Sequence, residues 1–154
     1  MKTRTDYLVE ALAWILAAAF FYAIGCALMG VRVHADTLDS IARIESSGRS
    51  QIVGDGGRAL GLFQMHRAAW NDACQRLGVS WPHSSAIDPK RARTVAANHL
   101  AWLCAQFEKE TGRKPNASET YALWNLGIEG FKRRNFNLNQ CPAITKRAAR
   151  KMVE

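Results

Sequence analysis

The sequence lacks the residue patterns of the common metal and nucleotide sites. It contains no Cys-x-x-Cys or His-Glu-x-x-His motif, and its four histidines have no spacing typical of zinc ligands (His34, His66, His83 and His99). The glycine-rich segment at residues 54–57 does not continue into Gly-Lys-Ser/Thr, which excludes a phosphate-binding loop of that type. We therefore predict that the protein binds no metal and no cofactor.

Acidic residues are few. The chain holds 13 Asp and Glu against 21 Lys and Arg. Three of the basic and two of the acidic residues precede residue 36, so residues 36–154 carry 18 basic and 11 acidic residues and a net charge of +7. Such a charge favours a polyanionic partner, namely nucleic acid, anionic lipid or a carboxylate-rich cell-wall polymer. No aromatic residue interrupts the basic cluster at residues 146–151, which disfavours nucleic acid bound by base stacking.

Charge is missing altogether from Ala11 to Val31. These 21 residues match the roughly 20 apolar residues that a helix needs to cross a bilayer. Lys2 and Arg4 precede them, and the positive-inside rule then places the N-terminus in the cytoplasm. We expect residues 1–35 to form a cytoplasmic tail and an inner-membrane anchor, and residues 36–154 to form one domain in the periplasm.

Two alternatives to a retained anchor stay open. Val33-His34-Ala35 has the small residues that a signal peptidase prefers, so residues 1–35 are alternatively a cleaved signal peptide. The apolar run exceeds the about 7–15 residues usual for the core of a signal peptide, which favours the anchor. Cys26 allows a lipoprotein, although Ala23 fits that motif weakly. All three interpretations export residues 36–154.

Cysteine is scarce in the exported part, which holds Cys74, Cys104 and Cys141. In an oxidising compartment we expect two of these three to pair, with one thiol left over. A disulfide that closes a loop of about 30 residues would contribute roughly 3 kcal/mol to stability. The sequence does not indicate which two residues pair.

Apolar spacing predicts a mainly α-helical domain with one small β-hairpin. A helix is expected from Asp36 or Thr37 to about residue 46, with Gly48 just beyond its end. Asp55-Gly56 indicates the hairpin turn within residues 51–63. Further helices are expected at residues 66–77, from Asp88-Pro89 to about residue 110, from a Ser118 cap to residue 124 or 125, and after Pro142, with a loop at residues 81–85.

Glu45 is the carboxylate best placed for chemistry. It shares one face of the first expected helix with Leu38, Ile41 and Ala42, so it points toward the core or a cleft wall. Burial raises the pKa of a carboxyl group, and a glutamate held protonated near neutral pH can act as a general acid. Asp55 is a second candidate carboxylate, but its place in a turn favours a structural role.

Three short segments follow one another in the chain: Glu45-Ser46-Ser47, Gly61-Leu62-Phe63-Gln64-Met65 and Leu123-Trp124-Asn125-Leu126-Gly127. In this order they resemble the signatures of the lytic transglycosylase family, which has a lysozyme-like (goose-type) fold, and the resemblance implies that residues 36–154 are a catalytic domain. The resemblance implies that Glu45 is the catalytic acid and base, followed by Ser46 as in many members. It also implies that Gln64, with Leu62 and Phe63, lines the sugar cleft.

The third signature departs from the family pattern. Trp124-Asn125 stands where the family more often has Tyr-Asn, so a hydroxyl that would orient the substrate is missing. Tyr121, one helical turn earlier, is a candidate to supply that hydroxyl, whereas Trp124 is expected to stack on a sugar or to fill the core.

The resemblance implies a function in the cell wall. Its substrate would be peptidoglycan glycan strands, cleaved at the β-1,4 bond between N-acetylmuramic acid and N-acetylglucosamine with a 1,6-anhydro product. The alternatives are a hydrolytic muramidase (lysozyme) and a non-catalytic basic module that binds cell wall or DNA. Tethered enzymes of this kind serve secretion or conjugation machines and phage assemblies, and the sequence does not choose among these partners.

Overall fold

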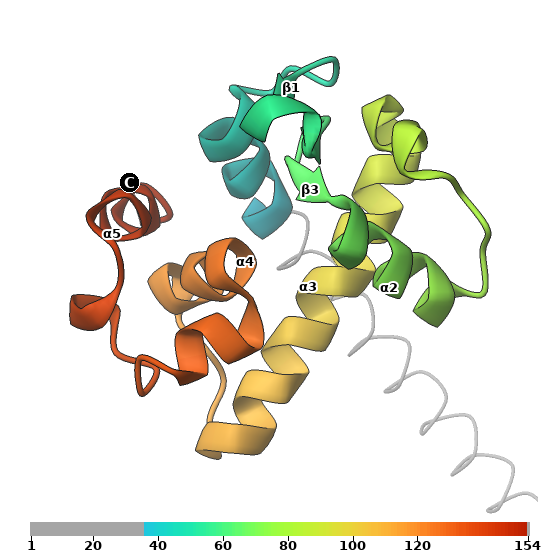
Figure 1. Ribbon diagram of the computed structural model, residues 1–154. Coiled ribbons are helices and arrows are strands. Elements are labelled where there is room, and N and C mark those ends of the chain that lie inside the picture. The colour runs from blue at the N-terminus through green and yellow to red at the C-terminus, as the bar shows by residue number, and fades with distance from the viewer. Residues whose placement is uncertain (1–35, 154) are drawn as a thin grey trace, which may run out of the picture. The chain divides into compact units, whose positions relative to one another are not determined.

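Helices make up most of residues 36–153, the part of the chain that the computed structural model describes. A helix over residues 36–46, which we call the Glu45 helix, comes first (Figure 1). The other helices are α2 (Arg67–Leu77), α3 (Pro89–Thr111), α4 (Ala117–Lys132) and α5 (Ala143–Arg150), with 3-10 turns η1 (Asp55–Gly57), η2 (His83–Ile87) and η3 (Leu138–Gln140). The expected mainly α-helical class is confirmed.

The expected membrane anchor or signal peptide, with the domain boundary after residue 35, lies outside the described residues. Within residues 36–153, no helix combines the length and the apolar character that a bilayer crossing requires.

The expected hairpin forms between β1 (Val53–Gly54) and β2 (Ala59–Leu60), and η1 makes its turn. A third strand, β3 (Met65–His66), pairs antiparallel with β2, opposite Leu60 and Ala59. This strand was not predicted, because two residues are too few to show an alternating pattern. The sheet joins the Glu45 helix to α2 and brings the segment around Gln64 back toward Glu45.

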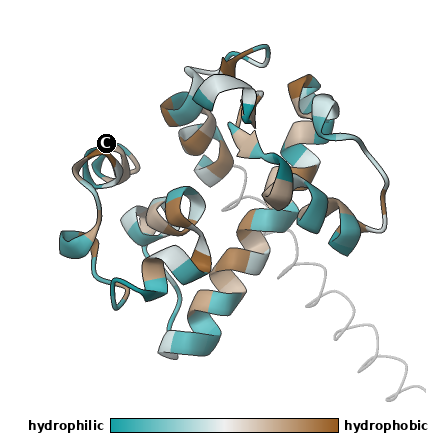
Figure 2. Cartoon of the chain, in the orientation of Figure 1, coloured by the Kyte–Doolittle hydropathy of each residue, from teal (hydrophilic) through white to brown (hydrophobic). Residues whose placement is uncertain are grey.

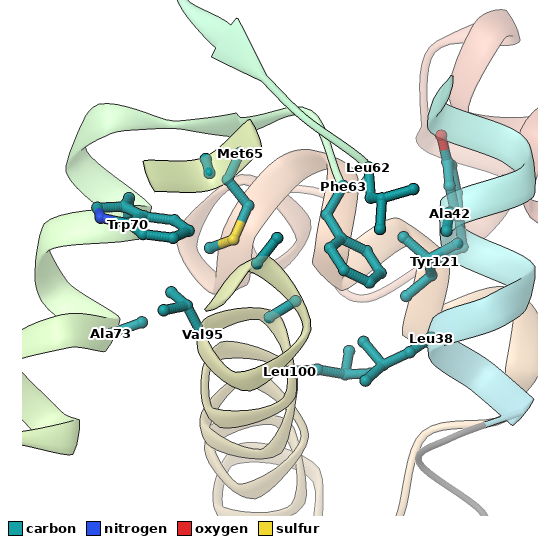
Figure 3. Close-up of a cluster of buried hydrophobic side chains, with 14 of the residues drawn as sticks. Leu38, Ala42, Leu62, Phe63, Met65, Trp70, Ala73, Val95, Leu100 and Tyr121 are labelled. Atoms are coloured by element: carbon teal, nitrogen blue, oxygen red, sulfur yellow. The ribbon is translucent and has the colours of Figure 1, made fainter. Parts of the chain in front are cut away.

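Helix α3 lies between α2 on one side and α4 on the other (Figure 1). Asp88 caps its N-terminus as predicted, accepting hydrogen bonds from the backbone N–H groups of Lys90 and Arg91. Apolar residues follow the helix along its length (Figure 2) and fill two cores. One core joins α3 to the Glu45 helix and α2, and Figure 3 shows part of it. The other joins α3 to α4.

The residue that caps helix α4 lies two residues earlier than predicted. Asn116, and not Ser118, is the cap: its side chain accepts from the Glu119 N–H at 2.9 Å, and the Glu119 carboxylate accepts from the Asn116 N–H at 2.9 Å. Ser118 instead donates its hydroxyl to Ala149 O of α5. The helix also continues past residue 125, with a break at Gly127, where φ is +69°.

Asn116→Ala tests this cap. We expect the substitution to lower the free energy of unfolding by about 1 kcal/mol, because the backbone N–H of Glu119 loses its acceptor, the Asn116 side-chain oxygen. Thermal unfolding of the variant measures the loss. Asn71→Ala, at an exposed site inside α2, is the matched control and should leave the melting temperature unchanged or slightly raised. Equal effects at both sites would contradict the capping role.

The expected disulfide is not present, and Cys74, Cys104 and Cys141 are free thiols. They lie in different surroundings: Cys74 in the core beside α2, where its thiol contacts Trp81 O, and Cys141 in the core beside α4. Each thiol faces its own partners and not another cysteine. The segment expected to be a loop at residues 81–85 is partly helical, because the 3-10 turn η2 begins at His83.

Candidate active site

A cavity of about 890 Å³ collects most of the residues that the sequence singled out. The Glu45 helix, the small sheet, α2, α3, α4 and α5 all contribute to its lining. Five of the eight predicted site residues line it, namely Glu45, Gln64, Tyr121, Trp124 and Asn125. This volume is within the range of small-molecule sites, about 300–1,000 Å³.

Glu45 lies next to the last residue of its helix, half-buried at the cavity wall. Burial removes water from the carboxylate and raises its pKa above the ordinary value. The hydrogen bond from Tyr121 and the charge of His66 lower that pKa by less, and the negative charge of Asp55 raises it further. Glu45 therefore holds its proton more tightly than a solvated glutamate, as a general acid requires.

Tyr121 supplies a hydroxyl to the site, as its position one turn before Trp124 suggested. Its hydroxyl donates to Glu45 Oε1 at 2.9 Å, which joins α4 to the Glu45 helix across 76 residues of sequence. The Tyr121 ring is buried in the core with Leu38 and Ala42 (Figure 3). Burial and the nearby Glu45 carboxylate raise the pKa of Tyr121, so it remains a donor at all physiological pH values.

The side chain of Gln64 is held by the backbone of the sheet segment. Its Nε2 donates to Gly61 O at 2.9 Å and to Ile52 O at 3.2 Å. Its own φ is +47°, an uncommon conformation for a residue with a side chain. Gly54 makes room for it, since a Cβ at that position would lie 2.2 Å from Gln64 Oε1. The amide is thus a fixed part of the cavity wall.

Trp124 and Asn125 reach the cavity from α4. Asn125 Oδ1 accepts from the buried Thr145 hydroxyl at 2.7 Å, which ties α4 to α5 and leaves the Asn125 amide group for a ligand. The Trp124 ring packs edge-on against His99, with ring centroids 5.7 Å apart, and against Phe63 at 6.1 Å. Trp124 therefore both fills the core and presents an aromatic surface to the cavity.

Three residues predicted to bind substrate lie elsewhere. Leu62 and Phe63 belong to the hydrophobic core, with exposed fractions of 8% and 1%, because an apolar side chain gains more from burial there than at a wet wall (Figure 3). Ser46 is also buried, and its hydroxyl donates back to Ala42 O at 3.0 Å inside its own helix. These three residues are neighbours of Glu45 and Gln64 in the sequence, but in the structure their side chains pack inside the protein.

The family model for the transglycosylase SLT domain matches residues 24–144. The chain belongs to this family. A crystal structure of an inactive mutant of the lytic transglycosylase Slt from Pseudomonas aeruginosa is similar in fold, with a TM-score of 0.56 and 17% identity. That match covers 82% of this chain and 20% of the Pseudomonas chain, so the present chain spans a fifth of its length. The comparison with curated proteins finds no match.

The fold of this SLT domain is lysozyme-like, as its sequence signatures implied. Its site also contains a contact that sequence reasoning did not find, between His66 and the second candidate carboxylate, Asp55. His66 Nε2 lies 2.8 Å from Asp55 Oδ2, and both residues line the cavity with Glu45. Asp55 therefore lines the cavity. The turn that holds Asp55 also places it in contact with His66, the residue that precedes α2. No pattern in the sequence links a turn at residue 55 with His66, because β2 and β3 are what bring them together.

His99 and Trp102 also line the cavity of the SLT domain, and Arg76, which is not a lining residue, contacts both of them. Arg76 Nη2 lies 3.1 Å from His99 Nδ1, and since arginine only donates, His99 is a neutral acceptor there. Burial and the charge of Arg76 lower the pKa of His99 to about 4. The Arg76 guanidinium also lies 4.7 Å from the centre of the Trp102 ring, which stacks on His99. No sequence pattern indicates that Arg76 and Trp102 contact His99.

Among residues 36–153, no three His, Cys, Asp or Glu side chains are grouped as ligands for a metal ion. The described site offers a partly desolvated carboxyl group, a tyrosine hydroxyl, amides, aromatic rings and the Asp55–His66 pair.

Proposed function

We propose that this SLT domain is a peptidoglycan lytic transglycosylase that uses Glu45 as its catalytic acid and base. The observation that supports it best is the Tyr121–Glu45 hydrogen bond at the wall of a sugar-sized cavity. The substrate would be the β-1,4 bond between N-acetylmuramic acid and N-acetylglucosamine. The family and the lysozyme-like fold support the same proposal.

The first step is protonation of the glycosidic oxygen by Glu45. Tyr121 donates to Oε1, so Oε2 carries the acid proton and gives it to the leaving oxygen as the bond from that oxygen to C1 of N-acetylmuramic acid breaks. The acetamido group of the same sugar stabilises the positive charge on C1. The Glu45 carboxylate then takes the proton of the sugar's 6-hydroxyl, whose oxygen bonds to C1 and closes the 1,6-anhydro ring. Glu45 ends protonated, ready for the next cycle.

The pH profile should report this role of Glu45. The acid must be protonated in the first step, so kcat/KM should fall as pH rises through the raised pKa of Glu45. Tyr121→Phe removes a hydrogen bond that lowers this pKa, and we expect the alkaline limb of the profile to move to higher pH. We also expect about a tenfold to hundredfold loss of kcat, because the carboxyl group loses its fixed orientation.

The measurement is the rate of muropeptide release from purified sacculi across pH 5 to 9. Tyr7, in the predicted cytoplasmic tail, offers a matched Tyr→Phe control that should leave the profile unchanged. If the alkaline limb of the Tyr121→Phe profile does not move, the Tyr121 hydroxyl does not influence the pKa of Glu45.

Hydrolysis is the second candidate, and Asp55 favours it because its carboxylate lines the same cavity as Glu45. Most glycosidases need two carboxyl groups, one as acid and one as base or nucleophile. Product mass distinguishes the reactions, since the anhydro product is lighter by one water than the reducing-end product. We expect anhydro products from the wild type and from Asp55→Asn. Reducing ends that Asp55→Asn abolishes would make the protein a lysozyme.

We also propose that residues 11–31 anchor the protein in the inner membrane and that residues 36–154 act in the periplasm. The uncharged run and the preceding Lys2 and Arg4 support this arrangement. A local hole in the wall would then serve a secretion or conjugation machine or a phage assembly. Protease treatment of spheroplasts tests the topology, because only a periplasmic domain is digested while the membrane is intact.

A further inference from the structure

One face of α5 forms part of the cavity wall. Thr145 and Ala149, which do not line the cavity, are buried against the rest of the domain. The cavity face repeats at helical spacing and consists of Ile144, Arg147, Ala148 and Lys151. Arg133, the residue at the C-terminal end of α4, lines the same cavity. We call Arg133, Arg147 and Lys151 the cationic wall.

The charges of the cationic wall have no partner within residues 36–153. None of the three side chains makes a hydrogen bond or an ion pair there, whereas Arg93 pairs with Asp39 at 2.7 Å and Lys132 with Glu110 at 2.8 Å. Glu129 also lines the cavity, and its negative charge raises the pKa of Lys132. Three free cations thus share one cavity with Glu45, and they are available to an anionic part of whatever binds there.

The structure assigns to the cationic wall the recognition of carboxylates on the peptide stems of the glycan strand. This inference rests on the proposed function, which identifies the polymer. In peptide-bearing strands the lactyl carboxyl group of N-acetylmuramic acid is bound to the peptide as an amide, so the sugars are uncharged and the anionic groups are the free carboxylates of the peptides. Guanidinium and ammonium groups bind carboxylates through charge-assisted hydrogen bonds. The domain therefore favours peptide-bearing strands over strands stripped of their peptides.

The test measures binding and not cleavage. The full chain carrying Glu45→Gln is kept in mild detergent and titrated with two probes. One is peptide-bearing glycan strands, and the other is the same strands after an amidase has removed the peptides and the lactyl carboxyl groups so exposed have been converted to methylamides. We expect the peptide-bearing strands to bind about threefold to tenfold more tightly at low salt, because a few exposed ion pairs contribute modestly and are screened. Adding Arg147→Gln and Lys151→Gln should remove this preference.

Two matched variants control for charge. Arg150→Gln with Lys109→Gln removes the same net charge from exposed sites outside the cavity and should keep the preference. Arg147→Lys with Lys151→Arg exchanges the two cations and should also keep it. Equal binding of both strands by the parent chain, or an equal loss in the Arg150 and Lys109 control, would overturn the inference.

Binding by the inactive variant separates this inference from the proposed function. If the native chain cleaves neither strand, the proposed function is wrong. A retained preference for peptide-bearing strands would still support carboxylate recognition by the cationic wall. If Arg147→Gln with Lys151→Gln leaves strand binding unchanged but abolishes binding to vesicles of phosphatidylglycerol, α5 is a lipid surface and the inference is wrong.

Discussion

Glu45→Gln is expected to lower the release of muropeptides from purified sacculi by about a thousandfold or more. The glutamine amide cannot donate an acidic proton to the glycosidic oxygen or take one from the 6-hydroxyl, and general acid–base catalysis alone contributes about 10²–10⁴-fold. Glutamine keeps an oxygen that can accept from Tyr121, so the wall of the cavity should remain in place. Mass spectrometry of the released products, at matched protein concentration, measures the loss.

The same variant should fold at least as well as the wild type at neutral pH. Because the pKa of Glu45 is higher in the folded than in the unfolded protein, folding takes up a proton, and low pH favours the folded state. The corresponding penalty is absent below the unfolded pKa and complete above the folded pKa. Glutamine mimics the protonated acid, so the Glu45→Gln variant does not carry this penalty at any pH. Thermal unfolding at pH 8 should give an unchanged or higher melting temperature, which distinguishes lost chemistry from lost structure.

Glu45→Asp provides the matched control, since it keeps a carboxyl group but withdraws it by one methylene. We expect activity between that of the wild type and that of Glu45→Gln, because proton transfer depends on a hydrogen-bond distance. Full activity of Glu45→Gln on sacculi would remove Glu45 from the mechanism and would require a different catalytic acid.

Sequence reasoning located the residues whose chemistry is local in the chain. Asp88 caps α3 as predicted because Asp-Pro acts within one turn. Glu45 faces the cavity because helical spacing fixes its direction relative to Leu38 and Ile41. Tyr121 was found from its offset of one turn from Trp124, and its hydroxyl does reach Glu45.

Long-range pairs were beyond the sequence. The contact between Asp55 and His66 depends on how β2 and β3 pair, and the contact between Arg76 and His99 depends on how α2 packs against α3. Adjacency in a motif was also misleading: Ser46 and Phe63 are neighbours of cavity residues in the chain, yet both are buried. A motif can be retained for packing as well as for binding, and only the fold separates the two.

Gly61 serves both packing and the site, because it packs against η2 and its carbonyl oxygen holds the Gln64 amide. We expect Gly61→Ala to be the most destabilising small substitution in the sheet segment. Its φ is +77°, and a Cβ there would lie 1.8 Å from the backbone oxygen of Ala86 in η2. A backbone atom cannot turn aside as a side chain does, so the sheet and η2 must separate. We expect a loss of about 3 kcal/mol or more, from left-handed strain and overpacking together.

The melting temperature measures this effect, and it should fall by about 10 °C or more. Gly112→Ala is the matched control, because its φ of +73° carries the same strain while nothing lies within 4 Å of the added Cβ. The control should lose only about 1 kcal/mol. Equal losses would mean that the approach of Gly61 to η2 does not matter. Because Gly61 O also accepts from Gln64 Nε2, the variant should release that amide and weaken binding of glycan strands even where the domain remains folded.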